Sequence, residues 1–224
     1  TLLKGRWKVR VEKVINIPLT YGGRAAFMIQ NVLAATLAAY LQNISIEDIR
    51  SGLTTFVPSV AQTPGRLNLI EMGNFTVLID FAHNPAGMEA LQRFISKFPN
   101  KIKTGVIGGT GDRRDDDLLL YGRTAAQMFT NVIVREDDDL RGRAPGETKQ
   151  LVIEGIKSIN PEMPIKEASD ATEAINDALR HARKGELLVI LADNVARSIE
   201  LVSKFREQRT PVTVVHEDIP NLHA

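Results

Sequence analysis

The order of apolar and polar positions divides the chain into two parts that meet near residue 63. After that point, short apolar runs alternate with segments in which apolar residues recur every three to four positions, which is typical of strands alternating with helices. The pattern predicts strands at 67–72, 75–80, 103–107, 131–135, 165–168, 187–192 and 212–215, and helices at 86–98, 116–129, 148–159, 171–183 and 195–208. Apolar strands separated by amphipathic helices indicate an α/β fold with a mostly parallel sheet covered on both faces.

Residues 1–63 follow a different pattern. Loose alternation with many β-branched residues predicts a strand at 7–17, and 25–41 is expected to form a helix. Because that helix is apolar nearly all round, we expect it to be buried. A shorter helix should begin at Ser45, which has the spacing of a capping box, and end before Pro58. We therefore expect one domain at 1–63 and a second at 64–224.

Composition narrows the functional classes. The chain has 28 Lys and Arg against 27 Asp and Glu, so its charge gives no sign of a nucleic-acid or membrane partner. It has no cysteine, which excludes disulfides, thiolate nucleophiles and cysteine-based zinc sites. The apolar stretches are too short to span a bilayer, and the N-terminus lacks the pattern of a signal peptide. We expect a cytoplasmic protein.

Chemistry is expected in the loops that follow the strands, because ligands of parallel sheets bind at the carboxyl ends of the strands. The first such loop runs from Asp80 to Pro85. Asn84 and Pro85 suit the cap and the first residue of a helix. That local role accounts for neither Asp80 nor His83. A strand-terminal Asp can accept hydrogen bonds from ribose hydroxyls, and a His at a helix N-terminus can contact phosphate.

A glycine-rich loop follows the strand at 103–107. Its glycines allow the backbone to approach a ligand closely, but residues 109–111 lack the third glycine of a dinucleotide-binding fingerprint. The adjacent Arg113 and Arg114 could bind a carboxylate or a phosphate with two hydrogen bonds. The acids at 115–117 are explained as favourable charges at a helix N-terminus.

The third loop, 135–143, combines four acids with three flanking arginines, Arg135, Arg141 and Arg143. It is either a solvated run of charges or a site for a zwitterion, in which the acids recognise a cationic group and an arginine holds a carboxylate. Other catalytic signatures are absent from the sequence: it contains no P-loop, no nucleophile elbow, and no metal-ligand spacing among its four histidines.

Three motifs resemble those of the Mur ligase superfamily, the ATP-dependent enzymes that form amide bonds and include the folylpolyglutamate synthetases. They are Pro-Gly-Arg-Leu-Asn-Leu-Ile at 64–70, Gly-Asp-Arg-Arg-Asp-Asp-Asp at 111–117 and Glu-Asp-Asp-Asp-Leu-Arg-Gly-Arg at 136–143, with the 80–85 loop between the first two. Within the superfamily they are most similar to the cyanophycin synthetases. The resemblance implies a Rossmann-like, mostly parallel six-stranded sheet at 64–224, preceded at 1–63 by the α+β end of the superfamily's central ATPase domain.

The resemblance also implies roles for individual residues. Asn31 would lie near adenine, Arg66 and Asp80 near the ribose, and His83 and Asn84 near the phosphates or an acyl phosphate. The residues implied at the amino-acid substrate site are Gly111, Asp112, Arg113, Asp137, Asp138, Asp139 and Arg141.

The implied enzyme uses ATP and Mg²⁺ to join arginine to the aspartate side chains of a polyaspartate backbone through an acyl phosphate. Because the P-loop is absent here, the resemblance implies that a missing N-terminal part binds most of the nucleotide and the metal, that this chain alone is inactive, and that the intact enzyme is a homo-oligomer. Two alternatives stay open: a fragment of a peptidoglycan-type or folate-type Mur ligase, and a non-catalytic nucleotide-binding module. A nucleotide-sugar or folate site upstream would favour the former, and an upstream P-loop would exclude the latter.

Overall fold

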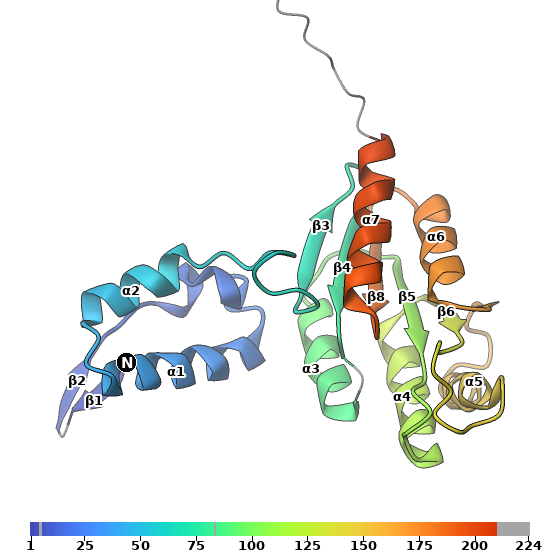
Figure 1. Ribbon diagram of the computed structural model, residues 1–224, viewed down its shortest axis with the longest axis horizontal. Coiled ribbons are helices and arrows are strands. Elements are labelled where there is room, and N and C mark those ends of the chain that lie inside the picture. Colours follow the sequence, from blue (N-terminus) through green and yellow to red (C-terminus); the bar gives the residue numbers. More distant parts are fainter. Residues whose placement is uncertain (5, 83, 210–224) are drawn as a thin grey trace, which may run out of the picture.

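The structure, a computed structural model, describes residues 1–4, 6–82 and 84–209 (Figure 1). Within these residues, six strands form one sheet in the order β3 (Asn68–Glu71), β4 (Thr76–Asp80), β8 (Leu187–Leu191), β5 (Lys103–Gly108), β6 (Asn131–Arg135) and β7 (Ile165–Ala168). β3 pairs antiparallel with β4, as expected of a hairpin, and the other neighbours are parallel. The expected α/β fold is therefore confirmed, while the strand expected at 212–215 lies outside the described residues.

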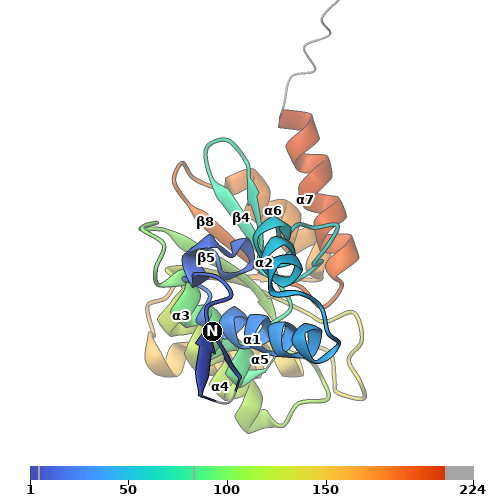
Figure 2. The same ribbon diagram turned by 90° about the vertical axis from the view of Figure 1, so that its left-hand side faces the viewer.

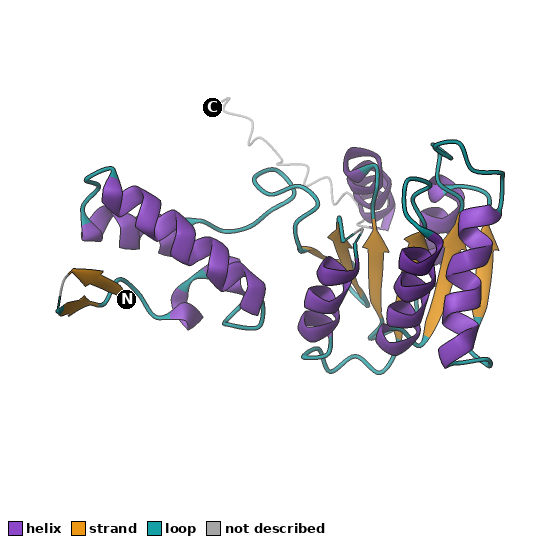
Figure 3. Ribbon diagram, turned by 90° about the horizontal axis from the view of Figure 1, so that it is seen from below, coloured by secondary structure: helices purple, strands orange, loops and turns teal. Residues whose placement is uncertain are grey.

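Helices cover both faces of the sheet (Figure 3). They are α3 (Pro85–Ile95), α4 (Asp115–Met128) and α5 (Glu147–Ile159) on one face, and α6 (Ala171–His181) and α7 (Val195–Arg209) on the other. Successive side chains of a strand point to opposite faces. Accordingly, Leu78 packs with the first group of helices, while Val77 and Ile79 pack with the second.

The register aligns the carboxyl ends of the parallel strands. Asp80 at the end of β4 is paired with Leu191 of β8, and Gly108 at the end of β5 is paired with Arg135 of β6. The loops that follow these four strands therefore begin at the same edge of the sheet, where a ligand site is expected in this type of fold.

Residues 1–63 form a smaller part, shown at the left of Figure 1. It contains the hairpin β1 (Leu2–Lys4) and β2 (Trp7–Val9), the short 3-10 helices η1 (Val14–Asn16) and η2 (Pro18–Thr20), and the helices α1 (Ala26–Leu41) and α2 (Ile46–Thr55). The expectation of one strand at 7–17 was wrong beyond Val9. Pro18 has a fixed φ angle and no N–H to donate to a neighbouring strand. The Thr20 hydroxyl lies within hydrogen-bond distance of the Val14 and Ile17 carbonyls (2.8 and 2.9 Å), so these local contacts favour turns over strand pairing.

Helix α1 forms as expected but is not buried all round. Met28, Val32 and Thr36 are buried, whereas Leu33, Leu37 and Leu41 are 53%, 50% and 67% exposed. The physical reason is that α1 contacts only η2, α2 and α3 to any extent among the described residues, so one side of the helix has no neighbour. The shorter helix α2 begins as expected, with the Ser45 side chain accepting the Asp48 N–H at 3.1 Å.

The two parts meet at α1 and α3, and Figure 2 shows the smaller part in front of the larger one. The Tyr21 hydroxyl donates a hydrogen bond to the Leu67 carbonyl at 2.5 Å, and the Tyr21 ring packs edge-on against Phe94. The Lys97 ammonium donates to the Arg24 carbonyl at 2.7 Å. The segment 56–67, where the sequence predicts the domain boundary, contains no helix or strand.

Candidate functional site

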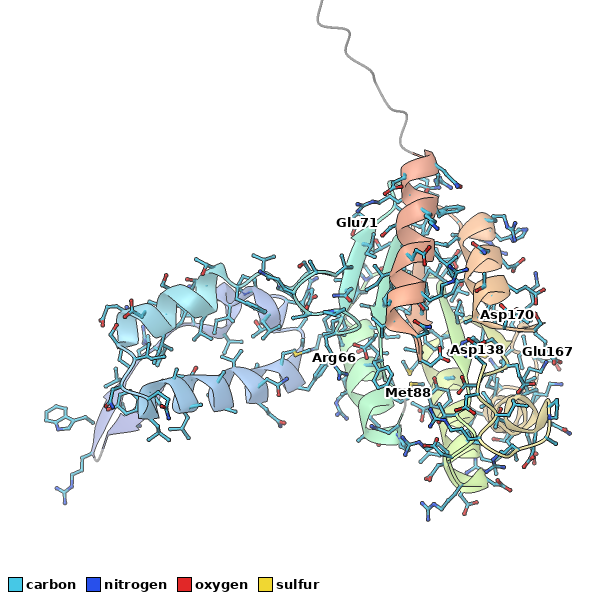
Figure 4. The ribbon with its side chains drawn as sticks, in the orientation of Figure 1. Arg66, Glu71, Met88, Asp138, Glu167 and Asp170 are labelled. Carbon is cyan, nitrogen blue, oxygen red and sulfur yellow. The ribbon has the colours of Figure 1, made fainter. Side chains whose placement is uncertain are left out.

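The first strand-end loop is held to the turn at 65–67 by the carboxylate of Asp80. Its two oxygens accept the backbone N–H groups of Leu67 and Ala82, both at 2.9 Å. Burial raises the pKa of Asp80, against the opposing effect of these hydrogen bonds. The same turn presents Arg66, whose guanidinium lies 5.6 Å from the centre of the Phe81 ring. Arg66 is exposed and lies at the junction of the two parts of the chain (Figure 4).

The start of α3 confirms the local role expected of Asn84. The Asn84 side chain accepts the Gly87 N–H at 2.8 Å, and Pro85 is the first helical residue. His83, the second candidate catalytic residue, lies outside the described residues.

The glycine loop and the acidic loop are packed against one another. A Cβ atom on Gly111 would lie 2.1 Å from the Leu140 carbonyl oxygen, so only glycine fits here without movement of the backbone. Arg143 joins the two loops, because its guanidinium donates to the Gly111 carbonyl at 3.0 Å and to the Arg113 carbonyl. Two of the three predicted loops therefore form one unit.

The acids of the third loop have different roles. The Glu136 carboxylate accepts hydrogen bonds from the Gly146 N–H (2.7 Å) and the Thr148 hydroxyl (3.3 Å), so it anchors the segment where α5 begins. Asp138 and Asp139 are exposed, as expected of a solvated charge run. Asp137 is buried.

A buried ion cluster closes the end of β6. The Arg135 side chain is 3% exposed, and its guanidinium donates to the Asp193 carboxylate at 2.7 Å and lies 3.8 Å from Asp137. Burial and the hydrogen-bonded Asp193 carboxylate raise the pKa of Asp137 to about 7. Burial would also raise the pKa of Asp193, but the hydrogen bond from Asp137 and the Arg135 charge outweigh it and lower that pKa. Asp193 therefore ionises at a lower pH than Asp137, which is about half ionised near pH 7.

These loops enclose a cavity of about 260 Å³ at the carboxyl edge of the sheet. Its volume approaches the lower end of the range typical of small-molecule sites, roughly 300–1,000 Å³. The lining residues come from the loops after β4, β5, β6 and β8 and from α4: Phe81, Ala82, Gly108, Thr110, Asp112, Arg113, Tyr121, Arg135, Arg141, Leu191, Ala192 and Asp193.

Charged groups of both signs line this cavity. The Arg141 guanidinium pairs with the Asp112 carboxylate at 2.7 Å. Burial acts to raise the pKa of Asp112, but the nearby charge of Arg141 opposes this effect and the pKa is lowered. The Nε atom of Arg113 is buried and has no hydrogen-bond partner among the described residues. An unpartnered buried donor is costly, so an acceptor on a ligand would stabilise it.

The structure brings together only some of the predicted substrate residues. Asp112, Arg113 and Arg141 line the cavity, Gly111 supports its wall, and Asp137 lies behind it against Arg135. Asp138 and Asp139 are not among the lining residues.

Among the lining residues with charged or titratable side chains, Tyr121 and Asp193 were missing from the predicted set. Applying the strand-end rule to the run at 187–192 would have found Asp193. Arg135 was predicted only as one of the arginines that flank the acids, and nothing in the sequence indicates that it is buried against Asp193.

Asn31, predicted near adenine, lies elsewhere. It is exposed on α1, its side-chain amide is 3.5 Å from the Met28 sulfur, and it lines a separate, apolar cavity of about 300 Å³ between α1 and α2. The structure therefore places the predicted nucleotide residues Asn31 and Arg66 on different elements, one on α1 and the other in the turn before β3.

No helix in the described part of the chain has the length and apolar character needed to cross a membrane. Among the same residues, no group of three or more His, Cys, Asp and Glu is placed to hold a metal ion.

Comparison with known proteins identifies relatives. A family described as Mur ligase, glutamate ligase domain, matches residues 65–194. The chain is 46% identical over 222 residues to cyanophycin synthetase from Nostoc sp., which covers 96% of this chain and 25% of that protein. It is 31% identical over 180 residues to UDP-N-acetylmuramyl-tripeptide synthetase from Borreliella burgdorferi, covering 78% of this chain and 34% of that protein. The chain thus spans about a quarter of the length of the cyanophycin synthetase that it matches.

A solved structure has a similar fold. E. coli FolC in complex with ADP superimposes with a TM-score of 0.56 at 22% identity, covering 73% of this chain and 36% of that one.

Proposed function

The chain belongs to the Mur ligase family, and we propose that it is the C-terminal portion of an ATP-dependent amide ligase that resembles cyanophycin synthetase. In this proposal, the intact enzyme activates aspartate side-chain carboxylates of a polyaspartate backbone as acyl phosphates, and the amine of arginine displaces the phosphate. The observation that carries it is the 46% identity over nearly the whole chain, against 31% for the peptidoglycan enzyme.

The nucleotide is proposed to bind at the junction of the two parts. Arg66 is exposed there and is proposed to contact the ribose. Asp80 holds the turn that carries Arg66 in place by accepting the Leu67 N–H. We place His83 and Asn84 toward the phosphates, because the N-terminus of α3 favours negative charge. Asn31 is proposed to contact the adenine from α1.

The residues present do not make a magnesium site by themselves, since no cluster of potential ligands occurs among those described. We therefore propose that ATP and Mg²⁺ are held mainly by a part of the enzyme outside this chain.

The amino-acid substrate is proposed to bind in the cavity at the sheet edge. Asp112, Arg113 and Arg141 line this cavity, Gly111 and Asp137 border it, and Asp138 and Asp139 follow Asp137 in the same loop. The Nε of Arg113, which lies 4.0 Å from Asp112 Oδ1 but has no hydrogen-bond partner among the described residues, would be satisfied by the carboxylate of an amino acid. Closure of the two parts would exclude water, which would otherwise hydrolyse an acyl phosphate.

The first experiment measures phosphate release by the full-length protein with ATP, arginine and an aspartate polymer. We expect release that depends on both arginine and the polymer, and none from the present chain alone. Release that does not require arginine would contradict the proposed substrate. Turnover of the isolated chain at roughly 1 per second would contradict the proposal that it is only a portion of the active enzyme.

A second experiment tests the proposed contact between Arg66 and ATP. We expect Arg66→Ala in the full-length protein to raise the KM for ATP at least tenfold, about 1.4 kcal/mol of binding. Arg180→Ala is the matched control, because Arg180 is also an exposed arginine and lies on α6, away from the junction. Equal effects of the two substitutions would contradict the role of Arg66. Asp80→Ala and His83→Ala should lower arginine incorporation, but the backbone bonds of Asp80 mean that its variant must also be checked for folding.

A further inference from the structure

We propose that Asp193, positioned by Arg135 and Asp137, is the carboxylate that recognises the guanidinium of the incoming amino acid. This inference rests on the proposed function and names a residue that determines its substrate specificity. It also differs from the sequence-based expectation, which placed this role in the 137–139 acids.

Asp193 is the more enclosed of the two carboxylates that line the cavity. The carboxylates among the cavity-lining residues are Asp112 and Asp193. Asp112 lies at a more open position, with 48% of its side chain exposed, and is paired with Arg141. Asp193 is 23% exposed, so a ligand that reaches it is largely removed from water, where an ion pair discriminates more strongly. Asp138 and Asp139 face solvent instead.

The Asp193 carboxylate is held in place by Arg135 on one side and Asp137 on the other. The Arg135 guanidinium donates to Asp193 Oδ1 at 2.7 Å, and Arg135 itself has no freedom to move, because it is buried against Gly108. A Cβ atom at position 108 would lie 3.0 Å from the guanidinium carbon, so the glycine provides the space that Arg135 occupies. On the other side, Asp137 hydrogen-bonds to Asp193. The carboxylate is therefore held in one orientation before the ligand arrives, which lowers the entropy cost of binding.

The net charge of the cluster of Arg135, Asp137 and Asp193 depends on the proton of Asp137. With Asp137 protonated, Arg135 and Asp193 form a neutral pair. Loss of the Asp137 proton gives the cluster one net negative charge, which complements one guanidinium. Binding of a cation beside Asp193 should therefore be linked to release of this proton. The charged and titratable groups that face the cluster are Arg135 itself, Arg141 from the acidic loop, Asp170 from the cap of α6 and Tyr121 from α4.

The test compares arginine with citrulline in the full-length enzyme. Citrulline has the same shape but an uncharged urea group in place of the guanidinium. We expect Asp193→Asn to reduce the ratio of kcat/KM for arginine to that for citrulline at least tenfold, while the KM for ATP changes less than twofold. Asp116→Asn is the matched control, since it removes one exposed acid near the same edge of the sheet and should leave the ratio unchanged.

The outcomes separate the inference from the proposed function. If the wild-type enzyme shows no arginine-dependent phosphate release, the proposed function fails. If it does, but Asp193→Asn leaves the ratio unchanged while Asp138→Asn/Asp139→Asn reduces it, the inference is overturned and the acidic loop holds the guanidinium. Should Asp193→Asn fail to fold, Asp193→Glu keeps the charge opposite Arg135 and moves the carboxylate. A reduced ratio in that variant supports the inference, and an unchanged ratio overturns it.

The positioning role of Asp137 has its own measurement. The KM for arginine in the wild type should fall as the pH rises from about 6 to about 8, because Asp137 loses its proton in this range. In Asp137→Asn, which retains a hydrogen-bond donor to Asp193 but cannot ionise, the fall should be absent. The same fall in both enzymes would overturn the role of Asp137.

Discussion

A single added methyl group tests the close packing of α4 and α5. Gly122 of α4 lies against the backbone of α5: a Cβ atom there would be 2.1 Å from the Val152 carbonyl oxygen, whereas ordinary contacts begin at 3.4 Å. Gly155 of α5 faces α4 in the same way, at 2.2 Å from the Leu119 oxygen. A backbone carbonyl cannot rotate away as a side chain can, so Gly122→Ala requires the two helices to separate by more than 1 Å.

The magnitude follows from two opposing effects. Replacing glycine by alanine within a helix normally stabilises it by about 1 kcal/mol. Overpacking costs about 1–3 kcal/mol, and the upper end applies here because no rotamer relieves the clash. We expect Gly122→Ala to lower the free energy of unfolding by about 2 kcal/mol, which corresponds to a fall in Tm of about 4–8 °C for a protein of this size.

The assay is urea unfolding followed by far-UV circular dichroism, with amide hydrogen exchange to separate the two parts of the chain. Gly52→Ala in α2 is the control, because a Cβ atom there has no heavy atom within 4 Å. We expect this variant to slow the hydrogen exchange of the α2 amides, since alanine favours the helix over glycine. A Gly122→Ala variant as stable as the wild type would refute the close crossing. Since α4 and α5 begin at the two loops that build the cavity, separating them should also weaken binding of the amino acid.

Three further substitutions have defined outcomes. Glu136→Ala removes the acceptor of the Gly146 N–H at the start of α5 and should lower the free energy of unfolding by about 0.5–1.5 kcal/mol, measured by urea unfolding. Tyr21→Phe removes the hydrogen bond to Leu67 and should cost about 0.5–1.5 kcal/mol, with increased amide exchange at the junction of the two parts. Burial raises the pKa of Asp137 to about 7, so its ionised form is less favourable in the folded than in the unfolded chain. The wild type should therefore lose stability relative to Asp137→Asn as the pH rises from about 4 to about 7, and a constant difference across thermal melts at several pH values would contradict this.

The periodic part of the sequence predicted the fold because its signals are local. Strand and helix spacing at 64–209 reflects which side chains face the two cores, and helix caps such as Asn84 act on neighbours three residues away. The failures at 7–17 and in the burial of α1 have a different origin. β-branched content does not reveal whether a segment has a partner strand, and the burial of a helix depends on neighbours that its own sequence does not contain.

The candidate site was predictable in position but not in detail. The strand-end rule found the loops at 80–85, 109–114 and 136–143, which the parallel register brings to one edge. It could not tell which of three consecutive aspartates turns inward, because this depends on the buried arginine that each can reach. Arg135 pairs with Asp193, which is 58 residues away in the chain, and no local pattern encodes that contact.

The separation of the two proposed half-sites makes the contact between the parts functionally important. The amino-acid cavity is built by the sheet and its own loops, whereas Asn31 lies on α1, across the junction from Arg66. An acyl phosphate formed at the junction can react only with an amine held close to it, since reacting atoms must approach to about 3–3.5 Å. The position of α1 relative to the sheet therefore has to be controlled. Among the described residues, hydrogen bonds from Tyr21 and Lys97 cross this junction, and the exposed leucines of α1 lie outside it. A junction with so few polar contacts suits parts that must move relative to one another during a reaction cycle.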